Sequence, residues 1–182
     1  AACTATLNTS FGSKVLVPGT GILLNNQMDD FSIKPGVPNA FGLVGAEANA
    51  IAPGKRPLSS MSPTIVLKDG RPILTVGAAG GPTIITQALL TIIRTIDLDQ
   101  PLPEAVKAPR FHHQWKPDQV SVEKSLDPQV IAGLETRGHI LNPLASFGTC
   151  QAIALDPATL TFTAVSEPRG SGAAGCVSPT PQ

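Results

Sequence analysis

The first feature of the sequence that could do chemistry is a run of glycine and alanine from Gly77 to Gly81, between a strand-like segment and a helix-like one. In such a turn, successive backbone N–H groups can point into one concavity, and the dipole of the following helix adds positive potential. A concavity of this kind binds an anion or a developing oxyanion, and the missing side chains let a substrate approach closely. The alternative interpretation is a tight turn that needs positive φ angles. The spacing matches neither GxGxxG with an acidic ribose ligand nor GxxxxGK[ST], so it does not indicate nucleotide binding.

Two polar segments could hold opposite charges. Residues 25–31 read NNQMDDF, and dense amides and carboxylates in a loop can grip an ammonium group. Residues 55–63 read KRPLSSMSP, where adjacent hydroxyls behind a basic pair suit a carboxylate. The alternatives are Asx turns in the first segment and a purely structural loop in the second. No GxSxG elbow surrounds Ser59, so the sequence does not predict a nucleophilic serine there.

The segment from Phe111 to Trp115 contains two adjacent histidines, which raises the question of a metal site. Consecutive side chains point to different faces of a strand or helix, and no third ligand stands at a favourable spacing. We therefore predict that this motif packs in the core or an interface, with its polar side-chain atoms hydrogen-bonded. We predict no metal and no cofactor. The three cysteines, Cys3, Cys150 and Cys176, have no CxxC or CxxH spacing and allow at most one disulfide, whose pairing the sequence does not determine.

The bulk composition limits the classes of partner. Lys plus Arg and Asp plus Glu both number 13, so the formal net charge of zero gives no electrostatic reason to expect nucleic acid or an anionic membrane. A hydrophobic fraction of 42% with only 14% charged residues is typical of a folded protein, and suggests that another chain covers part of the surface. The length of 182 residues predicts a single domain, 1–182.

The elements that must position these residues follow a recognisable order. Ala1–Leu7 is predicted as a strand, and the long Gly-, Pro- and Asn-rich region from Asn8 to Met61 as ordered loops that build a site. Residues 63–67 and 72–76 predict a hairpin with an Asp-Gly turn. The apolar stripe of 84–96 predicts a helix, packed by residues at helical spacing, namely Ile84, Ile85, Ala88, Leu89, Ile92, Ile93 and Ile96.

The rest of the chain completes a layered fold. Asp127 and Pro128 predict the cap and first turn of a second helix that ends at Gly138. Residues 151–155 and 159–165 predict a last pair of strands around Asp156-Pro157. Strands, then helices, then strands indicate an α+β or α/β fold with a helix packed on a sheet.

Several of these segments together resemble a known family. Residues 6–12, 21–31, 56–64, 80–81, 108–115 and 166–169 occur in the order and spacing of the small subunit of γ-glutamyltransferases. The resemblance implies an α+β N-terminal nucleophile hydrolase, an αββα four-layer sandwich completed by a large subunit from the same precursor. It implies hydrolysis of the γ-glutamyl bond of glutathione and other γ-glutamyl compounds, and transfer to water, amino acids or peptides through a threonine acyl-enzyme. It also implies a periplasmic or extracellular location.

The resemblance assigns a role to each matching residue. Thr6 would orient the nucleophile, and the backbone N–H groups of Gly80 and Gly81 would form the oxyanion hole. The remaining assignments concern the two charges of the glutamyl head: the α-amino group would be held by Asn8, Gln27 and Asp30, and the α-carboxylate by Ser59 and Ser60, helped by an arginine of the large subunit.

The sequence departs from the family in two respects. The catalytic threonine is expected just upstream of Ala1, so the fragment itself is expected to be inactive. Ala78-Ala79 stands where the family usually has Ser-Pro, which removes a hydroxyl near the expected oxyanion site. Two alternatives are therefore kept: an acylase of the same superfamily acting on glutaryl or cephalosporin-type side chains, and a non-catalytic homologue.

Overall fold

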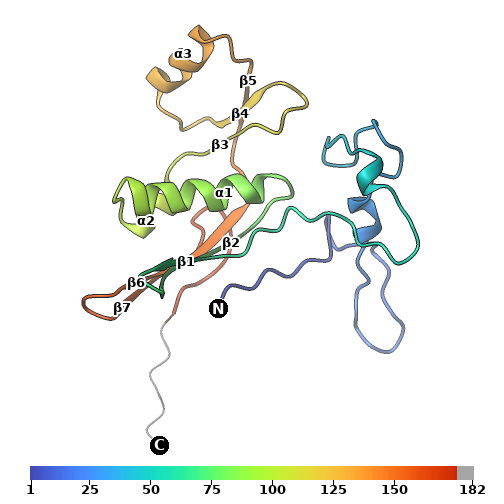
Figure 1. Ribbon diagram of the computed structural model, residues 1–182, viewed down its shortest axis with the longest axis horizontal. Helices are drawn as coiled ribbons and strands as arrows, with labels where there is room; N and C mark the ends of the chain where they lie inside the picture. The colour runs from blue at the N-terminus through green and yellow to red at the C-terminus, as the bar shows by residue number, and fades with distance from the viewer. Residues whose placement is uncertain (176–182) are drawn as a thin grey trace, which may run out of the picture.

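The computed structural model describes residues 1–175, so Cys176 lies outside the described residues. Its centre is a four-stranded antiparallel sheet in the order β1-β2-β6-β7, with one face covered by two helices (Figure 1). The elements of this body are β1 (Thr64–Lys68), β2 (Arg71–Ala79), α1 (Thr83–Ile92), α2 (Leu102–Lys107), β6 (Thr149–Asp156) and β7 (Thr161–Val165). A helix layer on a sheet confirms the predicted α+β class.

Both predicted strand pairs are confirmed. β1 and β2 are joined by Asp69 and Gly70 with φ angles of 52° and 75°, and a two-residue hairpin of this kind requires positive φ at both positions. β6 and β7 pair antiparallel around Asp156-Pro157, where Asp156 Oδ1 accepts a hydrogen bond from the Ala158 N–H at 2.9 Å. Turn chemistry therefore fixes the register of both hairpins.

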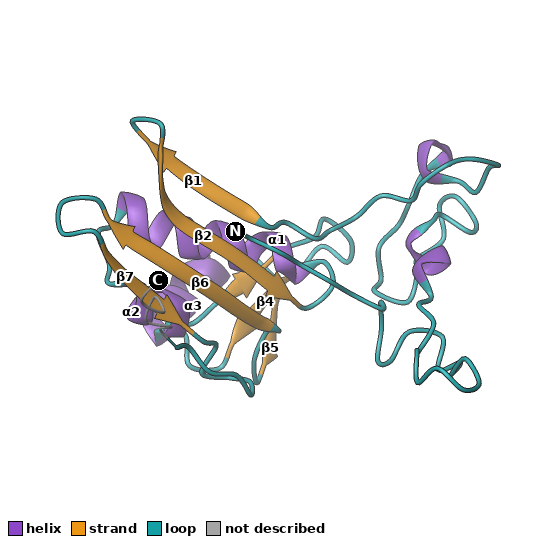
Figure 2. Cartoon of the chain, turned by 90° about the horizontal axis from the view of Figure 1, so that it is seen from below, coloured by secondary structure: helices purple, strands orange, loops and turns teal. Residues whose placement is uncertain are grey.

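The core lies between α1, α2 and the sheet. Alternate residues of β2, Leu74, Val76 and Ala78, are buried against the helices. The opposite face of the sheet is open: Ile65, Leu67, Ile153 and Phe162 are 42–69% exposed. Figure 2 looks onto this open face. An apolar sheet face left in water is typical of a surface that another layer covers.

The predicted helix over 84–96 is confirmed, with α1 continuing as one π-helical turn, η3 (Ile93–Asp97). The predicted facing is partly wrong. Ile84 and Ala88 are buried, but Ile85, Leu89, Ile93 and Ile96 are 36–53% exposed. The buried stripe is centred on Gln87 and Thr91. Two polar residues therefore occupy core positions while four of the predicted apolar residues are exposed.

A second, three-stranded sheet packs beyond α1 (Figure 1). It consists of β3 (Phe111–His112), β4 (Val120–Glu123) and β5 (Leu141–Leu144). The parallel pair β4–β5 requires a crossover, which α3 (Pro128–Thr136) supplies. Asp127 caps α3 by accepting from the Gln129 N–H at 2.7 Å, and Gly138 with φ 85° follows its end, as the sequence predicts.

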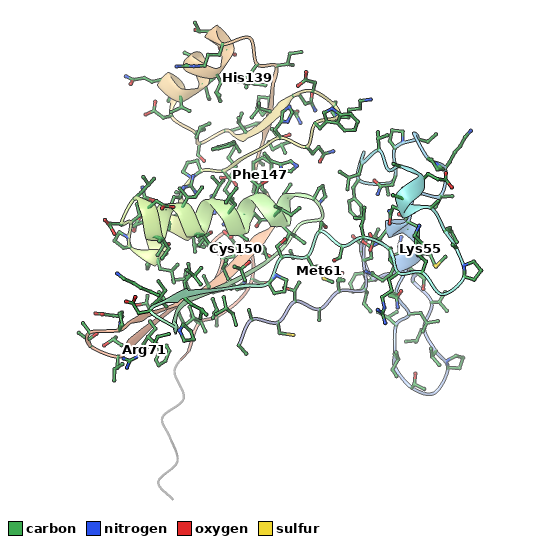
Figure 3. All side chains as sticks on the ribbon, in the orientation of Figure 1. Lys55, Met61, Arg71, His139, Phe147 and Cys150 are labelled. Carbon is green, nitrogen blue, oxygen red and sulfur yellow. The ribbon has the colours of Figure 1, made fainter. Side chains whose placement is uncertain are left out.

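Three buried charges, Arg110, Glu123 and Glu167, and the partly buried Arg169 join the two sheets. Arg110 pairs with Glu167, while Arg169 pairs with Glu167 at 2.8 Å and with Glu123 at 2.7 Å. The Glu167 carboxylate also accepts from the Cys150 N–H of β6. In Figure 3, Cys150 lies on β6 directly below α1, and Phe147, whose carbonyl accepts from Arg110, lies toward the three-stranded sheet. The segments 108–115 and 166–169 therefore supply this junction.

The prediction of a strand at Ala1–Leu7 is wrong for this chain. The segment is extended but has no strand partner, and it crosses the open face of the sheet (Figure 2), where a Cβ on Gly77 would lie 3.3 Å from Thr4 Oγ1. An extended segment becomes a strand only when a neighbour satisfies its backbone groups. No strand within residues 1–175 pairs with this segment.

Residues 8–58 form a loop-rich lobe to one side of the sheet (Figures 1 and 2), with two single-turn helices, η1 (Gln27–Asp30) and η2 (Glu47–Asn49). Met61 lies on the segment that links this lobe to β1 and packs against the core (Figure 3). Within residues 1–175, no helix has the length and apolar character needed to cross a bilayer.

Candidate active site

A cavity of about 1160 Å³ lies between the loop-rich lobe and the N-terminal end of α1. It brings together every residue that the sequence assigned to a site. Those lining residues are Thr6, Asn8, Gln27, Asp30, Ser59, Ser60, Gly80 and Gly81. They come from four separate segments of the chain, so the fold, not sequence proximity, assembles them.

One end of the cavity is built around the Asp30 carboxylate. Asn8 Nδ2 donates to Asp30 Oδ1 at 3.3 Å, and Gln27 Nε2 donates to Asp30 Oδ2 at 3.0 Å. Gln27 and Asp30 begin and end η1, so three-residue spacing brings them to one side of a helical turn. Thr6 joins this group because its Oγ1 accepts from the Asn8 N–H at 2.8 Å. Both carboxylate oxygens are thus oriented by amides.

The environment of Asp30 disfavours its charged form. Burial raises the pKa of the Asp30 carboxyl, and the nearby Asp29 charge raises it further, while the hydrogen bond from Asn8 opposes both. A cation placed at this carboxylate would relieve the penalty. The arrangement therefore suits an ammonium group.

Ser59 and Ser60 lie at another part of the cavity wall. Ser59 Oγ accepts from the Met61 N–H at 3.2 Å, and a hydroxyl that accepts in this way can still donate its proton to a carboxylate. Ser60 Oγ donates to the Gly81 carbonyl at 3.1 Å. Ser60 therefore ties the serine segment to the glycine turn, and must rotate its hydroxyl before it can donate to a ligand.

The glycine turn has the backbone conformation of a tight turn, and its role as an oxyanion site stays a prediction. Gly80 and Gly81 have φ angles of 143° and 59°, so the turn needs positive φ. A Cβ on Gly80 would lie 2.6 Å from Thr83 Oγ1, and one on Gly81 would lie 3.0 Å from Phe41. β2 continues through Ala79, which pairs with Thr149, so the alanines at 78 and 79 keep the strand intact. The turn then leads directly into α1.

Asn49 is a site residue that the sequence did not reveal. Its Nδ2 donates to the Asp30 carbonyl at 2.8 Å, and its Oδ1 accepts from the Leu58 N–H at 2.9 Å. It therefore bridges the Asp30 segment and the serine segment. An asparagine in a loop is so common a turn residue that no local signal distinguished this one.

The two histidines do not form a metal site within the described residues, where no group of three His, Cys, Asp or Glu side chains is arranged for an ion. Instead, His112 Nδ1 is hydrogen-bonded to Thr86 Oγ1 at 2.8 Å and His112 Nε2 to Gln114 Oε1 at 3.1 Å. Gln114 also donates to the Phe41 carbonyl, which closes one wall of the cavity. The predicted packing is therefore confirmed for His112, which is buried, but not for Phe111 and Trp115, which are 42% and 63% exposed.

Comparison with known proteins gives the same family that the motifs suggest. The family model described as Gamma-glutamyltranspeptidase matches residues 1–177. The chain is 53% identical over 156 residues to the glutathione hydrolase proenzyme of Escherichia coli (strain K12), covering 86% of this chain and 27% of that protein. It thus spans about a quarter of the length of that relative.

Solved structures extend the likeness to the fold. A mutant of Helicobacter pylori gamma-glutamyltranspeptidase superposes with a TM-score of 0.89 at 48% identity, covering 92% of both chains. A cephalosporin acylase from Bacillus halodurans gives a TM-score of 0.79 at 31% identity over 90% of this chain and 29% of that one. The expected N-terminal nucleophile hydrolase architecture is therefore confirmed, with this chain supplying the small-subunit part. With a family model matched over almost its whole length, the chain belongs to the gamma-glutamyltranspeptidase family.

Proposed function

We propose that this chain, joined to the rest of its precursor, hydrolyses the γ-glutamyl amide bond of glutathione and related compounds and transfers the γ-glutamyl group to water, amino acids or peptides. The observation that carries the proposal is that Asp30, Ser59 and the Gly80-Gly81 turn line one cavity. An anion for an ammonium, a hydroxyl for a carboxylate and a glycine nest for an oxyanion match the groups of a γ-glutamyl substrate.

The residues divide the work by position. Asp30, aligned by Asn8 and Gln27, binds the α-ammonium, and the Ser59–Ser60 segment binds the α-carboxylate. Fixing both charges places the γ-carbonyl near the glycine turn, and such positioning accounts for much of the rate that enzymes gain. Acyl groups without these charges would lose the ion pair with Asp30 and the hydrogen bonds of the serine segment, and should therefore react more slowly.

The nucleophile is a threonine expected outside residues 1–182. Its oxygen attacks the γ-carbonyl carbon, its α-amino group takes the hydroxyl proton, and that proton passes to the leaving amine as the C–N bond breaks. Water or an acceptor amine then attacks the ester and releases the threonine. Thr6, hydrogen-bonded to the Asn8 N–H, lies at the cavity wall where its hydroxyl can orient this nucleophile.

A large subunit from the same precursor is the proposed partner. Two observations support it. The apolar face of the four-stranded sheet is open, and within residues 1–175 no basic side chain is hydrogen-bonded to Ser59 or Ser60. A second chain would cover the sheet face and supply the arginine expected beside the serines. A periplasmic or extracellular location remains a proposal from the family resemblance, tested by fractionating cells that express the full gene.

The test uses the full-length precursor and two chromogenic anilides. The γ-glutamyl anilide should be cleaved, and Asp30→Ala should lose most of that rate, while Asp97→Ala, an exposed acidic control, should not. An acylase would prefer the glutaryl anilide, which lacks the α-amino group and gains nothing from Asp30. A precursor that cleaves neither substrate would support the non-catalytic homologue.

A further inference from the structure

Gln87 is a buried amide on the face of α1 that packs toward the glycine turn. Its side chain is among the most buried of the described residues, at 1% exposure. Burying an amide in a core costs free energy unless its donors and acceptor are paired. The surrounding contacts therefore indicate what this side chain does.

Both ends of the amide are hydrogen-bonded. Gln87 Nε2 donates to the Ala79 carbonyl at 3.1 Å and to Thr83 Oγ1 at 3.0 Å. Gln87 Oε1 accepts from Arg110 Nη1 at 3.2 Å, which anchors it to the buried charge cluster. The Thr83 hydroxyl extends this hydrogen-bond network, because its Oγ1 donates to the Gly80 carbonyl at 2.8 Å.

These two carbonyls belong to the peptide groups that carry the amides of the proposed oxyanion hole. The Ala79 C=O and the Gly80 N–H are on one planar peptide, and the Gly80 C=O and the Gly81 N–H are on the next. In a trans peptide the C=O and N–H point in opposite directions. A side chain that holds the oxygen therefore fixes the direction of the N–H at the other end.

The space for this clamp is provided by glycine. A Cβ on Gly80 would lie 2.9 Å from Gln87 Nε2, and one on Gly148 would lie 2.7 Å from the same atom. Gly148 with a Cβ would also approach the Ala79 carbonyl oxygen to 2.0 Å. Both glycines thus leave room for the amide to reach the back of the turn.

We propose that Gln87 and Thr83 act together as positioning residues for the oxyanion hole: Gln87 aims the Gly80 N–H and Thr83 aims the Gly81 N–H. The catalytic consequence rests on the proposed γ-glutamyl chemistry. The clamp acts behind the turn, on the carbonyl side, and neither residue binds the substrate's charged head. Its loss should therefore affect the transition state more than substrate binding.

The first experiment is steady-state kinetics of the full-length precursor with a γ-glutamyl anilide. Gln87→Met keeps the length of the side chain but removes its hydrogen bonds, and Thr83→Val removes the hydroxyl. Deleting an oxyanion donor outright lowers kcat about 100- to 1000-fold. Misdirecting one should lower kcat about 10- to 100-fold with KM changed by less than about threefold. Thr83→Ser should restore kcat, because a hydroxyl at this position can still accept from Gln87 and donate to Gly80.

Thr91→Val is the matched control. Thr91 is buried one turn further along the same face of α1, and its hydroxyl donates to the Gln87 backbone carbonyl, not to the turn. It should lower thermal stability without lowering kcat. The double variant of Gln87→Met and Thr83→Val should lose more kcat than either single variant, because each residue holds a different peptide. Its loss should be smaller than the product of the two single losses, because the two side chains are hydrogen-bonded to each other.

A second readout separates this proposal from the proposed reaction. Hydrogen–deuterium exchange of the amides of residues 79–81 should quicken in Gln87→Met and Thr83→Val but not in Thr91→Val, whatever the catalytic activity. Unchanged exchange, or a loss that appears only in KM, would overturn the clamp. Quickened exchange in a precursor that cleaves no γ-glutamyl substrate would keep the clamp and overturn the reaction.

Discussion

Asn49 donates a hydrogen bond from Nδ2 to the backbone carbonyl of Asp30 at 2.8 Å while its Oδ1 accepts from the Leu58 N–H at 2.9 Å. Its own carbonyl accepts from the Ser32 N–H at 2.9 Å. One side chain thus sets the spacing between the loop that carries Asp30 and the loop that carries Ser59. The α-ammonium and α-carboxylate of a glutamyl group are bonded to the same carbon. The distance between the Asp30 loop and the Ser59 loop therefore has to match the distance between these two groups in the proposed substrate.

Asn49→Ala in the full-length precursor should raise KM for a γ-glutamyl anilide by up to about thirtyfold, because it removes two hydrogen bonds that are each worth about 1 kcal/mol. The value of kcat should change less, since the glycine turn is untouched. Asn142→Ala, which removes an amide bonded to Ser121 in the other sheet, is the matched control. Equal KM values for the two variants would contradict the bridging role.

The acid limb of kcat/KM should report Asp30. Its pKa is raised above 3.8 in the empty protein, chiefly by burial and then by Asp29. Ionising Asp30 therefore lowers the folding stability. The contribution of the protonated carboxyl to stability is fully present below pH 3.8 and is lost as the pH rises through the raised pKa. A substrate ammonium needs the charged form, so kcat/KM should fall as pH drops through that raised pKa.

Asn8→Ala should move this acid limb to higher pH, because the hydrogen bond from Asn8 lowers the pKa of Asp30. Asp30→Asn should abolish the limb together with most of the activity. The measurement is kcat/KM between mildly acidic and neutral pH with constant ionic strength. A limb that stays in place in Asn8→Ala would assign it to another group.

Glu167→Gln should lower the free energy of unfolding of the assembled protein by about 3–5 kcal/mol, as expected when one partner of a buried charge cluster is removed. Burial pushes the pKa of Glu167 up, but hydrogen bonds from Arg169, Arg110 and the Cys150 N–H hold it below 4.5. Its contribution is therefore present above pH 4.5 and is lost as pH falls through the lowered pKa. Urea unfolding should show the gap from wild type closing at acidic pH, whereas the exposed Glu104→Gln should show no gap at any pH.

Ile153→Glu should prevent stable association with the rest of the precursor, because it places a charge on the open sheet face where burial would leave it unpaired. Ile140→Glu, on a residue that is 67% exposed beside the three-stranded sheet, is the matched control. Co-purification of the two tagged parts measures the effect. Equal recovery of both variants would mean that the sheet face is not the interface.

Local sequence determined the elements whose signals are local. The Asp69-Gly70 turn, the apolar repeat of α1 and the Asp127-Pro128 cap each work through neighbours within a few residues, so their types were predictable. The facing of α1 was not, because the choice between Ile85 and Gln87 as a core residue depends on which partners lie across the helix. Gln87 can be buried there because its side-chain oxygen accepts a hydrogen bond from Arg110 of the buried charge cluster.

The strand predicted at Ala1–Leu7 also shows that local sequence determines conformation but not long-range pairing. Its residue types are those of a strand, but backbone groups pair only with a neighbour, and the described residues contain none for this segment. Extended conformation was thus predictable, and pairing was not.

The sequence by itself determined which chemical groups this protein has for the proposed zwitterionic substrate: Asp30, Ser59, Ser60 and two glycines, recognisable by residue type and motif order. Only the tertiary structure decided that they line one cavity, and that Asn49 and Gln87 hold its walls. The physical reason is that residue type is encoded one position at a time, whereas a hydrogen bond between segments requires atoms within about 3 Å of each other, a distance that the whole fold sets.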